Sequence, residues 1–546
     1  MLRKIQPHSV VWSVWAVMSV ALLIYVIRYG YNVPYYDDWN LVPLLDGSLK
    51  VDAKWLWDQH NAHRIPFPKL ILVSLLSVTG WDFRSGMFLD ALALIFVTAV
   101  LLRTSATIRG FSSYADLFFP LFLLHWGNFD YLLWNWQLNQ MIPVIIVLAI
   151  LSIMMACGLH LGGRALMCSS SGVVLLPLSG VNGLVYTPGL ALWLLLAGIH
   201  ARRSGAITSL IALCIGGLSL LLIPIYFDGL QSSTRYSGDM VYLIERSLAN
   251  LPALALTAAS FVAQGLGSGA VALSPFTAMI VSALMGICLG GVLKLVPDHF
   301  GITSLLFLIG VAGLVSAVSI SLIGNTSFYS RYALQAAPIL CWMFLLSVRC
   351  KGLFVFKCVQ LILMLLSVVA LYGNSSKGLA QARMKDQQFS AFVGDIRKGT
   401  PPSQLIARHQ RAIFPYPETG GASFHDSLDY WFDVLKKARH ATFANLGKDP
   451  DFQEVPLKER PQFVYGIRVT GYALQSAPRQ IAVSWSSSSA KRCHYWNPPP
   501  NPQDRKFEKF TCWIYEEIKD LKIETAPPLD TFSSMKVFLL IPMTSG

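Results

Sequence analysis

The feature that most constrains this chain is the recurrence of long apolar stretches. Each runs for roughly 18 residues or more, which is enough to cross a bilayer core of about 30 Å. The 546 residues are 54% hydrophobic and only 13% charged, whereas soluble domains carry about 25% charged residues. We therefore expect a polytopic α-helical membrane protein.

The first apolar stretch, Val10–Ile27, follows a basic start at Arg3 and Lys4. A signal peptide opens in the same way, but its apolar region is shorter, about 7–15 residues, and a small-residue cleavage site follows it. We interpret this stretch as an uncleaved first span. The net charge of +13 falls largely in short loops between spans, where the positive-inside rule explains it without a nucleic-acid partner.

A window of about 19 residues predicts about eleven spans. Their approximate cores are Val10–Ile27, Met87–Leu102, Ala115–Leu124, Met141–Met155, Gly172–Leu178, Val185–Ile199, Ser209–Phe227, Phe276–Leu293, Thr303–Leu322, Ala333–Leu346 and Leu353–Leu371. The stretches at Ala115 and Gly172 are short. Leu248–Leu266 is also apolar, but it contains Pro252 and Gln264, so it is either a twelfth span or a re-entrant element.

Basic residues predict the orientation of the spans. They occupy alternate short loops, at Arg103 and Arg109, Arg164, Arg202 and Arg203, and Arg349, Lys351 and Lys357. Placing all of these loops in the cytoplasm requires an even number of crossings between Arg203 and Arg349, which holds if Leu248–Leu266 does not span. The N-terminus is then inside, and everything after Leu371 is outside the cytoplasm.

The composition changes after Leu371, which divides the chain into a transmembrane domain, 1–372, and a C-terminal extracytoplasmic α+β domain with a β-rich end, 373–546. Helices are expected at Lys377–Arg397 and around Phe424–Ala444. Alternating, strand-like runs follow at Phe463–Ala473, Gln480–Trp485, Phe510–Tyr515 and Lys536–Ile541, with prolines at 498–502 marking a loop between them.

Most of the nine cysteines lie in apolar spans, where they act as small hydrophobic residues. No pair has the spacing of zinc ligands. Cys493 and Cys512 are the exceptions, because both lie in the polar C-terminal part. We predict a disulfide between them, which an oxidising compartment would preserve.

The loop at residues 29–69, directly after the first span, holds the strongest functional signal. It contains Tyr35-Tyr36-Asp37-Asp38-Trp39-Asn40, and then Trp55-Leu56-Trp57-Asp58-Gln59-His60-Asn61-Ala62-His63-Arg64. Adjacent carboxylates at a membrane face repel each other, so one can take up a proton as a general base. The cationic and imidazole groups suit a phosphate, and the tryptophans suit either a sugar ring or the membrane interface.

An acid pair directly after the first span resembles the GT-C superfamily of membrane glycosyltransferases. The stretch His60-Asn61-Ala62-His63-Arg64 is similar to a His-Asn-Glu-His-Arg motif of bacterial members that modify O-antigen and other surface glycans. Here Ala62 stands where that motif has Glu, which puts the role of that Glu in doubt for this chain. Asn128–Gln137, Ser179–Leu184 and Ser330-Arg331-Tyr332 fit the same resemblance, which covers roughly Leu2 to Leu371.

The resemblance implies a mechanism and a set of residue roles. A sugar on polyprenyl phosphate is the donor, a glycan or lipid-linked glycan is the acceptor, and membrane lipids surround both. Asp37 is the expected base and Asp38 a supporting acid. Metal dependence stays open, and no metal-ligand residues are assigned. The expected substrate-binding residues are His60, His63, Arg64, Arg331, Tyr332, Trp39, Trp134 and Gln137.

We expect three other histidines, His125, His160 and His200, to be isolated from one another and to have structural or interfacial roles. Several alternative functions remain open. A transporter or flippase for lipid-linked glycans would place charges inside its spans, a ligase or polymerase would place its key residues in a later external loop, and a receptor-like scaffold would bind through its C-terminal domain.

Overall fold

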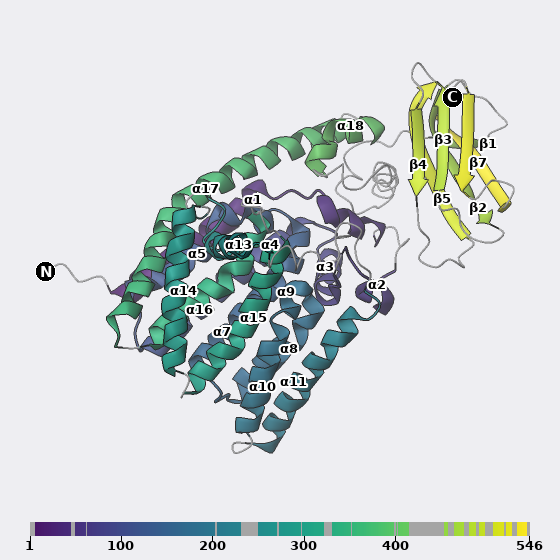
Figure 1. The fold of residues 1–546 in the computed structure, drawn as a ribbon. Coiled ribbons are helices and arrows are strands. Elements are labelled where there is room, and N and C mark those ends of the chain that lie inside the picture. The colour runs from purple at the N-terminus through teal and green to yellow at the C-terminus, as the bar shows by residue number, and fades with distance from the viewer. Residues whose placement is uncertain are drawn as a thin grey trace. The chain divides into compact units, whose positions relative to one another are not determined.

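The structure is a computed structural model of the chain (Figure 1). It describes residues 6–44, 50–61, 63–201, 205–230, 249–269, 272, 274–295, 298–321, 330–350, 352–397, 400, 402–413, 452–456, 463–473, 480–486, 491–496, 506–517, 520–526 and 532–542. The chain forms two compact units. The helix unit comprises Met1–Gly30, Val51–Ser77 and Arg84–Arg383, and the second unit comprises Tyr31–Lys50, Val78–Phe83 and Met384–Gly546.

Eight helices among the described residues are long and apolar enough to cross a membrane. They are α1 (Pro7–Tyr29), α4 (Arg84–Arg109), η4 with α7 (Asn135–Gln137 and Leu138–Cys157), α11 (Ala206–Phe227), α14 (Pro275–Leu295), α15 (His299–Ser321), η7 with α16 (Ser330–Ala336 and Ala337–Arg349) and α17 (Phe354–Arg397). Each overlaps a predicted span. The predicted multi-pass helical architecture is therefore supported at this level.

Three other predicted spans form shorter elements. Ala115–Leu124 is divided between η2 (Tyr114–Leu117) and α5 (Phe118–Leu123), Gly172–Leu178 between α8 (Gly163–Leu175) and η5 (Pro177–Ser179), and Val185–Ile199 lies in α10 (Thr187–Ala201). Proline contributes to the first two interruptions, because Pro120 and Pro177 cannot donate the backbone hydrogen bond that continues a helix.

The broken segment at 112–126 nevertheless runs alongside α1. His8, near the start of α1, contacts the Ser112 hydroxyl at 3.3 Å. Tyr25, near the end of α1, stacks on Trp126 with ring centroids 5.5 Å apart. The helix advances about 26 Å between His8 and Tyr25 at 1.5 Å per residue. The broken segment therefore covers the thickness of the helix unit without a long helix.

Contacts within the helix unit define its two ends. The Arg109 end holds the His8–Ser112 contact, the Arg109–Gln360 hydrogen bond at 3.0 Å, and the Arg349 guanidinium over the Phe300 ring. The Trp126 end holds the Tyr25–Trp126 pair, the bond from the Tyr25 hydroxyl to the Gly378 carbonyl at 2.8 Å, and the bond from the Ser268 hydroxyl to the Gly127 carbonyl at 3.0 Å.

The centre of the helix unit is a buried apolar core around α16. Every residue from Ala337 to Val348 is buried, and Phe344 stacks on Phe118 with centroids 5.0 Å apart. Side chains on α1 such as Val17, Val20 and Ile27 are instead exposed, as expected for a helix whose outer face meets lipid.

The remaining described helices are short. They are η1 (Tyr36–Leu44), α2 (Ala53–Trp57), α3 (Pro66–Val78), η3 (Trp126–Asn128), α6 (Phe129–Leu132), α9 (Val181–Leu184), α13 (Leu251–Gln264) and α18 (Pro402–Ile413). The predicted span at Leu353–Leu371 and the predicted helix at Lys377–Arg397 form one element, because α17 runs unbroken through both. No proline interrupts this stretch.

The described strands form two antiparallel sheets. One has the order β1-β7-β2-β5 and the other the order β4-β3-β6, with β1 at Phe452–Pro456, β2 at Phe463–Ala473, β3 at Gln480–Ser486, β4 at Lys491–Trp496, β5 at Lys506–Glu517, β6 at Asp520–Ala526 and β7 at Phe532–Pro542. The four predicted strand-like runs coincide with β2, β3, β5 and β7. The helix expected around Phe424–Ala444 and the proline-rich loop lie outside the described residues.

Candidate functional site

The acid pair lies on η1 in the second unit. The helix opens at Tyr36, whose φ of +52° is a left-handed conformation that is unfavourable for a bulky residue. The Asp38 carboxylate accepts a hydrogen bond from the Tyr35 backbone N–H at 3.1 Å, and the Asp38 side chain is fully buried. This contact satisfies a free donor at the start of the helix, as the third residue of a capping box does.

Asp37 is in a different environment from Asp38. It is half-buried, and its backbone carbonyl accepts a hydrogen bond from the Asn40 side chain at 3.0 Å. Trp39 is fully buried, so it packs in the interior instead of presenting its ring to solvent. Of the two adjacent carboxylates, Asp38 is thus tied to its own backbone, and Asp37 is the one that solvent reaches.

The part of α17 beyond Arg383 packs against the segment that carries the acids. The Tyr31 hydroxyl bonds to Asp386 and to Ser390, and the Tyr35 ring contacts Phe389 with centroids 5.7 Å apart. The Lys385 ammonium lies 4.6 Å from the centre of the Tyr35 ring. Lys385 is a cation that sequence reasoning missed, because it belongs to a helix assigned to a separate domain.

His60 and His63 form a tight turn in the helix unit. Their backbones exchange two hydrogen bonds of 2.8 and 3.1 Å. Asn61, between them, has a φ of +51°, a conformation that asparagine tolerates better than most residues. The His60 ring packs on Trp136, with centroids 4.8 Å apart. The turn therefore places the His60 ring against the aromatic segment that precedes α7.

Arg64 is held by groups of the protein itself. Its side chain is 8% exposed, and its guanidinium donates to the Asp228 carbonyl at 2.6 Å and to the Trp57 carbonyl at 3.4 Å. Its backbone N–H donates to the Tyr226 hydroxyl at 3.0 Å. These contacts hold the 51–64 loop against the end of α11, which gives Arg64 a positioning role.

Lys69 makes a similar connection at the start of α3. Its ammonium donates to the carbonyls of Trp55 and Asp58, each at 2.8 Å. Burial lowers the pKa of Lys69 to about 8, and the charge of Asp58 partly opposes this shift. Lys69 therefore stabilises the fold of the loop that follows the acid segment.

Charged and polar side chains gather at the Trp126 end of the helix unit, in a group that we call the charged cluster: Asp130, Ser330, Arg331 and Lys377. Ser330 bonds to the Asp130 carboxylate, and the Tyr131 hydroxyl donates to the Arg331 carbonyl. The Lys377 ammonium donates to the Ser268 carbonyl at 2.7 Å and interacts electrostatically with Asp130. Arg331 and Tyr332 are partly exposed, and the guanidinium lies 5.4 Å from the centre of the Tyr332 ring.

Two predicted substrate-binding residues lie inside the helix unit. Trp134 and Gln137 are both 3% exposed. The Gln137 side-chain oxygen is buried and has no hydrogen-bond partner among the described residues. A buried acceptor without a donor is costly, so Gln137 is available to a ligand that brings an N–H or O–H group.

The prediction that His160 and His200 are isolated is wrong. Their rings are neighbours, and His299 joins them. Among the candidates that the sequence did bring forward, the structure joins His60 with His63, and Arg331 with the Asn128–Gln137 segment through Tyr131. Asp130 and Lys377 were missed as site residues, although the segment of Asp130 had been singled out.

No protein-family model, curated protein or solved structure matches this chain.

Proposed function

We propose that this chain is a GT-C-type membrane glycosyltransferase that transfers a sugar from a polyprenyl phosphate to a glycan or lipid-linked acceptor. The observation that carries the proposal is the difference between the two adjacent carboxylates of η1. Asp38 is buried and bound to the Tyr35 N–H, and Asp37 is half-exposed behind the strained Tyr36. Backbone strain of this kind is typical of functional sites.

In this proposal Asp37 takes the proton of the acceptor hydroxyl as that oxygen attacks the anomeric carbon. A positioned carboxylate general base accelerates such a step about 10²–10⁴-fold. Asp38 holds the turn that carries Asp37. The bond between the anomeric carbon and the donor phosphate oxygen breaks, and negative charge develops on the leaving phosphate.

Cations then stabilise the leaving phosphate. Arg331 is the leading candidate because it is partly exposed and its backbone is anchored by Tyr131. Its planar guanidinium can bind a phosphate through two parallel hydrogen bonds. Lys377 adds positive charge within the same charged cluster, and Lys385 does so in the second unit. Arg64 is already engaged by two carbonyls, so we assign it to positioning.

We further propose that the Arg109 end faces the cytoplasm and that the Trp126 end, with the charged cluster, faces outward across a bacterial inner membrane. Basic residues gather at this end: Arg109 and Arg349 lie there, and Lys294 lies in the last turn of α14. Cytoplasmic loops carry an excess of such residues. A donor lipid in the outer leaflet then presents its phosphate at the level of Arg331.

The test is turnover by the purified protein with a panel of polyprenyl-phosphate sugars, read as released lipid phosphate. Asp37→Asn should insert and fold normally, and turnover should fall by about 10²–10⁴-fold. Asp52→Asn is the matched control in the same loop, since Asp52 caps α2 through the Trp55 N–H and asparagine caps equally well. Turnover near wild type in Asp37→Asn would exclude Asp37 as the base.

One observation favours a transporter as the second candidate. Asp90 lies about two turns into α4, is fully buried, and neither of its carboxylate oxygens has a hydrogen-bond partner among the described residues. Ionisable residues inside membrane spans are typical of transport pathways and proton relays. If Asp90→Asn abolishes lipid-glycan translocation in vesicles and Asp37→Asn does not, the transporter is favoured over the transferase.

A further inference from the structure

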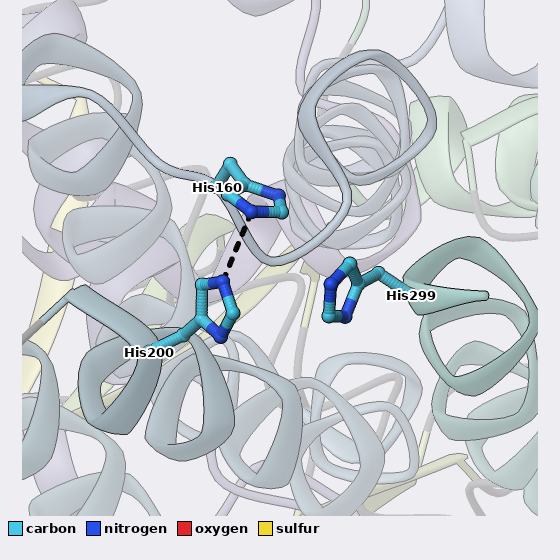
Figure 2. A group of neighbouring side chains, drawn as sticks. All are labelled: His160, His200 and His299. Carbon is cyan, nitrogen blue, oxygen red and sulfur yellow. Dashed lines mark hydrogen bonds between the residues drawn. The ribbon is translucent and has the colours of Figure 1, made fainter.

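Three histidines from three separate elements meet at the Arg109 end of the helix unit. His160 lies in the loop after α7, His200 in the last turn of α10, and His299 is the first residue of α15. Figure 2 shows the three rings turned toward a shared space, with the hydrogen bond between His160 and His200 drawn as a dashed line.

The distances between the ring nitrogens approach those of a metal site. One ring nitrogen from each histidine lies within 4.8 Å of the other two. The Nε2 atoms of His160 and His200 are 2.9 Å apart. A tetrahedral zinc ion with bonds of about 2.0–2.1 Å to imidazole places its ligand nitrogens about 3.3 Å apart. Small side-chain movements would therefore bring all three nitrogens onto one ion.

The ring orientations also favour convergence. The centroids are 4.5 Å apart for His160 and His200, and 4.9 Å for each of the other two pairs. The ring planes are inclined by 87°, 79° and 67°, so none of the pairs is stacked face to face. Inclined rings can direct their edge nitrogens toward a common point, as stacked rings cannot.

Packing around the histidines holds their backbones together. The Trp193 indole, two turns before His200 on α10, donates to the Gly158 carbonyl at 3.1 Å. The Phe300 ring, next to His299, packs on Gly158, whose φ of +61° turns the chain sharply out of α7. Each element that brings a histidine to the His160 loop thus also brings a side chain that holds this loop in place.

We propose that His160, His200 and His299 form a binding site for a divalent transition-metal ion of the zinc type. Imidazole nitrogen suits zinc, cobalt, nickel and copper, whereas magnesium and calcium prefer oxygen ligands. The described residues supply three ligands, and a water molecule completes a tetrahedron. His160 and His200 are exposed and His299 is half-buried, so the ion enters from solvent and joins the ends of α7, α10 and α15.

The charges around the three histidines are compatible with a bound cation. Among the described residues, Arg349 is a nearby positive group, and its guanidinium lies 3.3 Å from the centre of the Phe300 ring. The exposed carboxylate of Asp298, directly before His299, interacts electrostatically with Arg349 and offsets its charge. The site is also remote from the charged cluster, because α7 spans about 30 Å between its ends. Metal binding here can therefore be tested independently of sugar transfer.

The experiment uses full-length protein carrying an affinity tag without histidines, reconstituted in nanodiscs and stripped with a chelator. Titration with Zn²⁺ alone should show one ion per chain, and Co²⁺ should give the intense visible absorption of a four-coordinate ion. His200→Ala and His299→Ala should each weaken binding by at least the 10- to 100-fold that loss of an outer-shell partner costs. His8→Ala, an exposed histidine on α1, should bind like wild type.

A wild-type protein that binds no stoichiometric Zn²⁺, or alanine variants that bind it as tightly as wild type, would overturn the proposal. A second measurement covers variants that fail to fold. In the wild type, Zn²⁺ should protect His160, His200 and His299 from diethyl pyrocarbonate and leave His8 reactive. Equal modification of all four histidines with and without Zn²⁺ would also refute the site.

Discussion

Mutation of Arg64 tests whether this cation stabilises the fold or binds a ligand. Its guanidinium donates at 2.6 Å to the Asp228 carbonyl and at 3.4 Å to the Trp57 carbonyl, and its side chain is 8% exposed. Arg64→Met keeps most of the buried stem and removes both donors. A hydrogen bond from a charged group contributes about 1.5–3 kcal/mol, and the longer bond lies at the weak end. We therefore expect a loss of about 3–4.5 kcal/mol in the free energy of unfolding.

The assay is unfolding by SDS in mixed micelles, followed by tryptophan fluorescence. Arg64→Lys is the matched control, because an ammonium can reach one carbonyl but cannot reproduce the planar guanidinium, so about half of the loss should return. A change below about 0.5 kcal/mol, the size of an ordinary surface substitution, would refute the positioning role. Weakened donor binding together with unchanged stability would show instead that Arg64 acts on the ligand.

Four further predictions concern individual residues. Arg331→Ala should weaken binding of the polyprenyl-phosphate donor about 10- to 100-fold, equivalent to about 1.5–3 kcal/mol, with only partial rescue by Lys; unchanged affinity in an equilibrium binding assay would remove Arg331 from the phosphate site. Asp38→Ala should lower the free energy of unfolding by about 1–2 kcal/mol, through loss of its bond to the Tyr35 N–H, and a calorimetric trace like that of the wild type would contradict this. Lys69 has a pKa of about 8 when folded and 10.5 as its ordinary value, so the unfolded chain binds more protons between these limits; stability of the wild type relative to Lys69→Met should rise from pH 8 to pH 10.5, and parallel unfolding profiles would count against it. Cys493 on β4 and Cys512 on β5 should both resist thiol labelling in intact, unreduced protein and react after reduction, and labelling of both before reduction would exclude the disulfide.

The helical spans were predictable because hydropathy reports directly on the lipid environment. The limits of α17 were not. Hydropathy falls after Leu371, so the sequence predicted a new domain there, but solvent exposure does not end a helix. The residues that follow, such as Ala380, Arg383 and Lys385, are good helix formers, and α17 continues through them to Arg397.

The candidate site was predicted only where its residues are close in sequence. Asp37 and Asp38 are adjacent, and His60 and His63 share one turn. The charged cluster joins Asp130 to Ser330, 200 positions away. Such pairings depend on how helices pack, and no local pattern in a single sequence reports them.

The three-histidine group was missed for the same reason. His160 and His200 are 40 positions apart and lie at the ends of different helices, and His299 follows much later in the chain. Motif spacing detects metal ligands on one turn or one helix. It cannot detect ligands that three helix ends bring together.

The two ends of the helix unit also bear on whether Leu248–Leu266 crosses the membrane. Tyr226 and Asp228, at the end of α11, contact Arg64. The neighbouring residue Ile65 lies against Gly180. Gly180 follows the C-terminal end of α8, whereas Arg164 lies at the N-terminal end of that helix. Ser268 bonds to Gly127 at the Trp126 end. The end of α11 and Ser268, which follows α13, thus both lie at the Trp126 end of the helix unit. With its 14 residues, α13 is shorter than the roughly 20 residues of a typical span. This length favours a re-entrant element over a twelfth span.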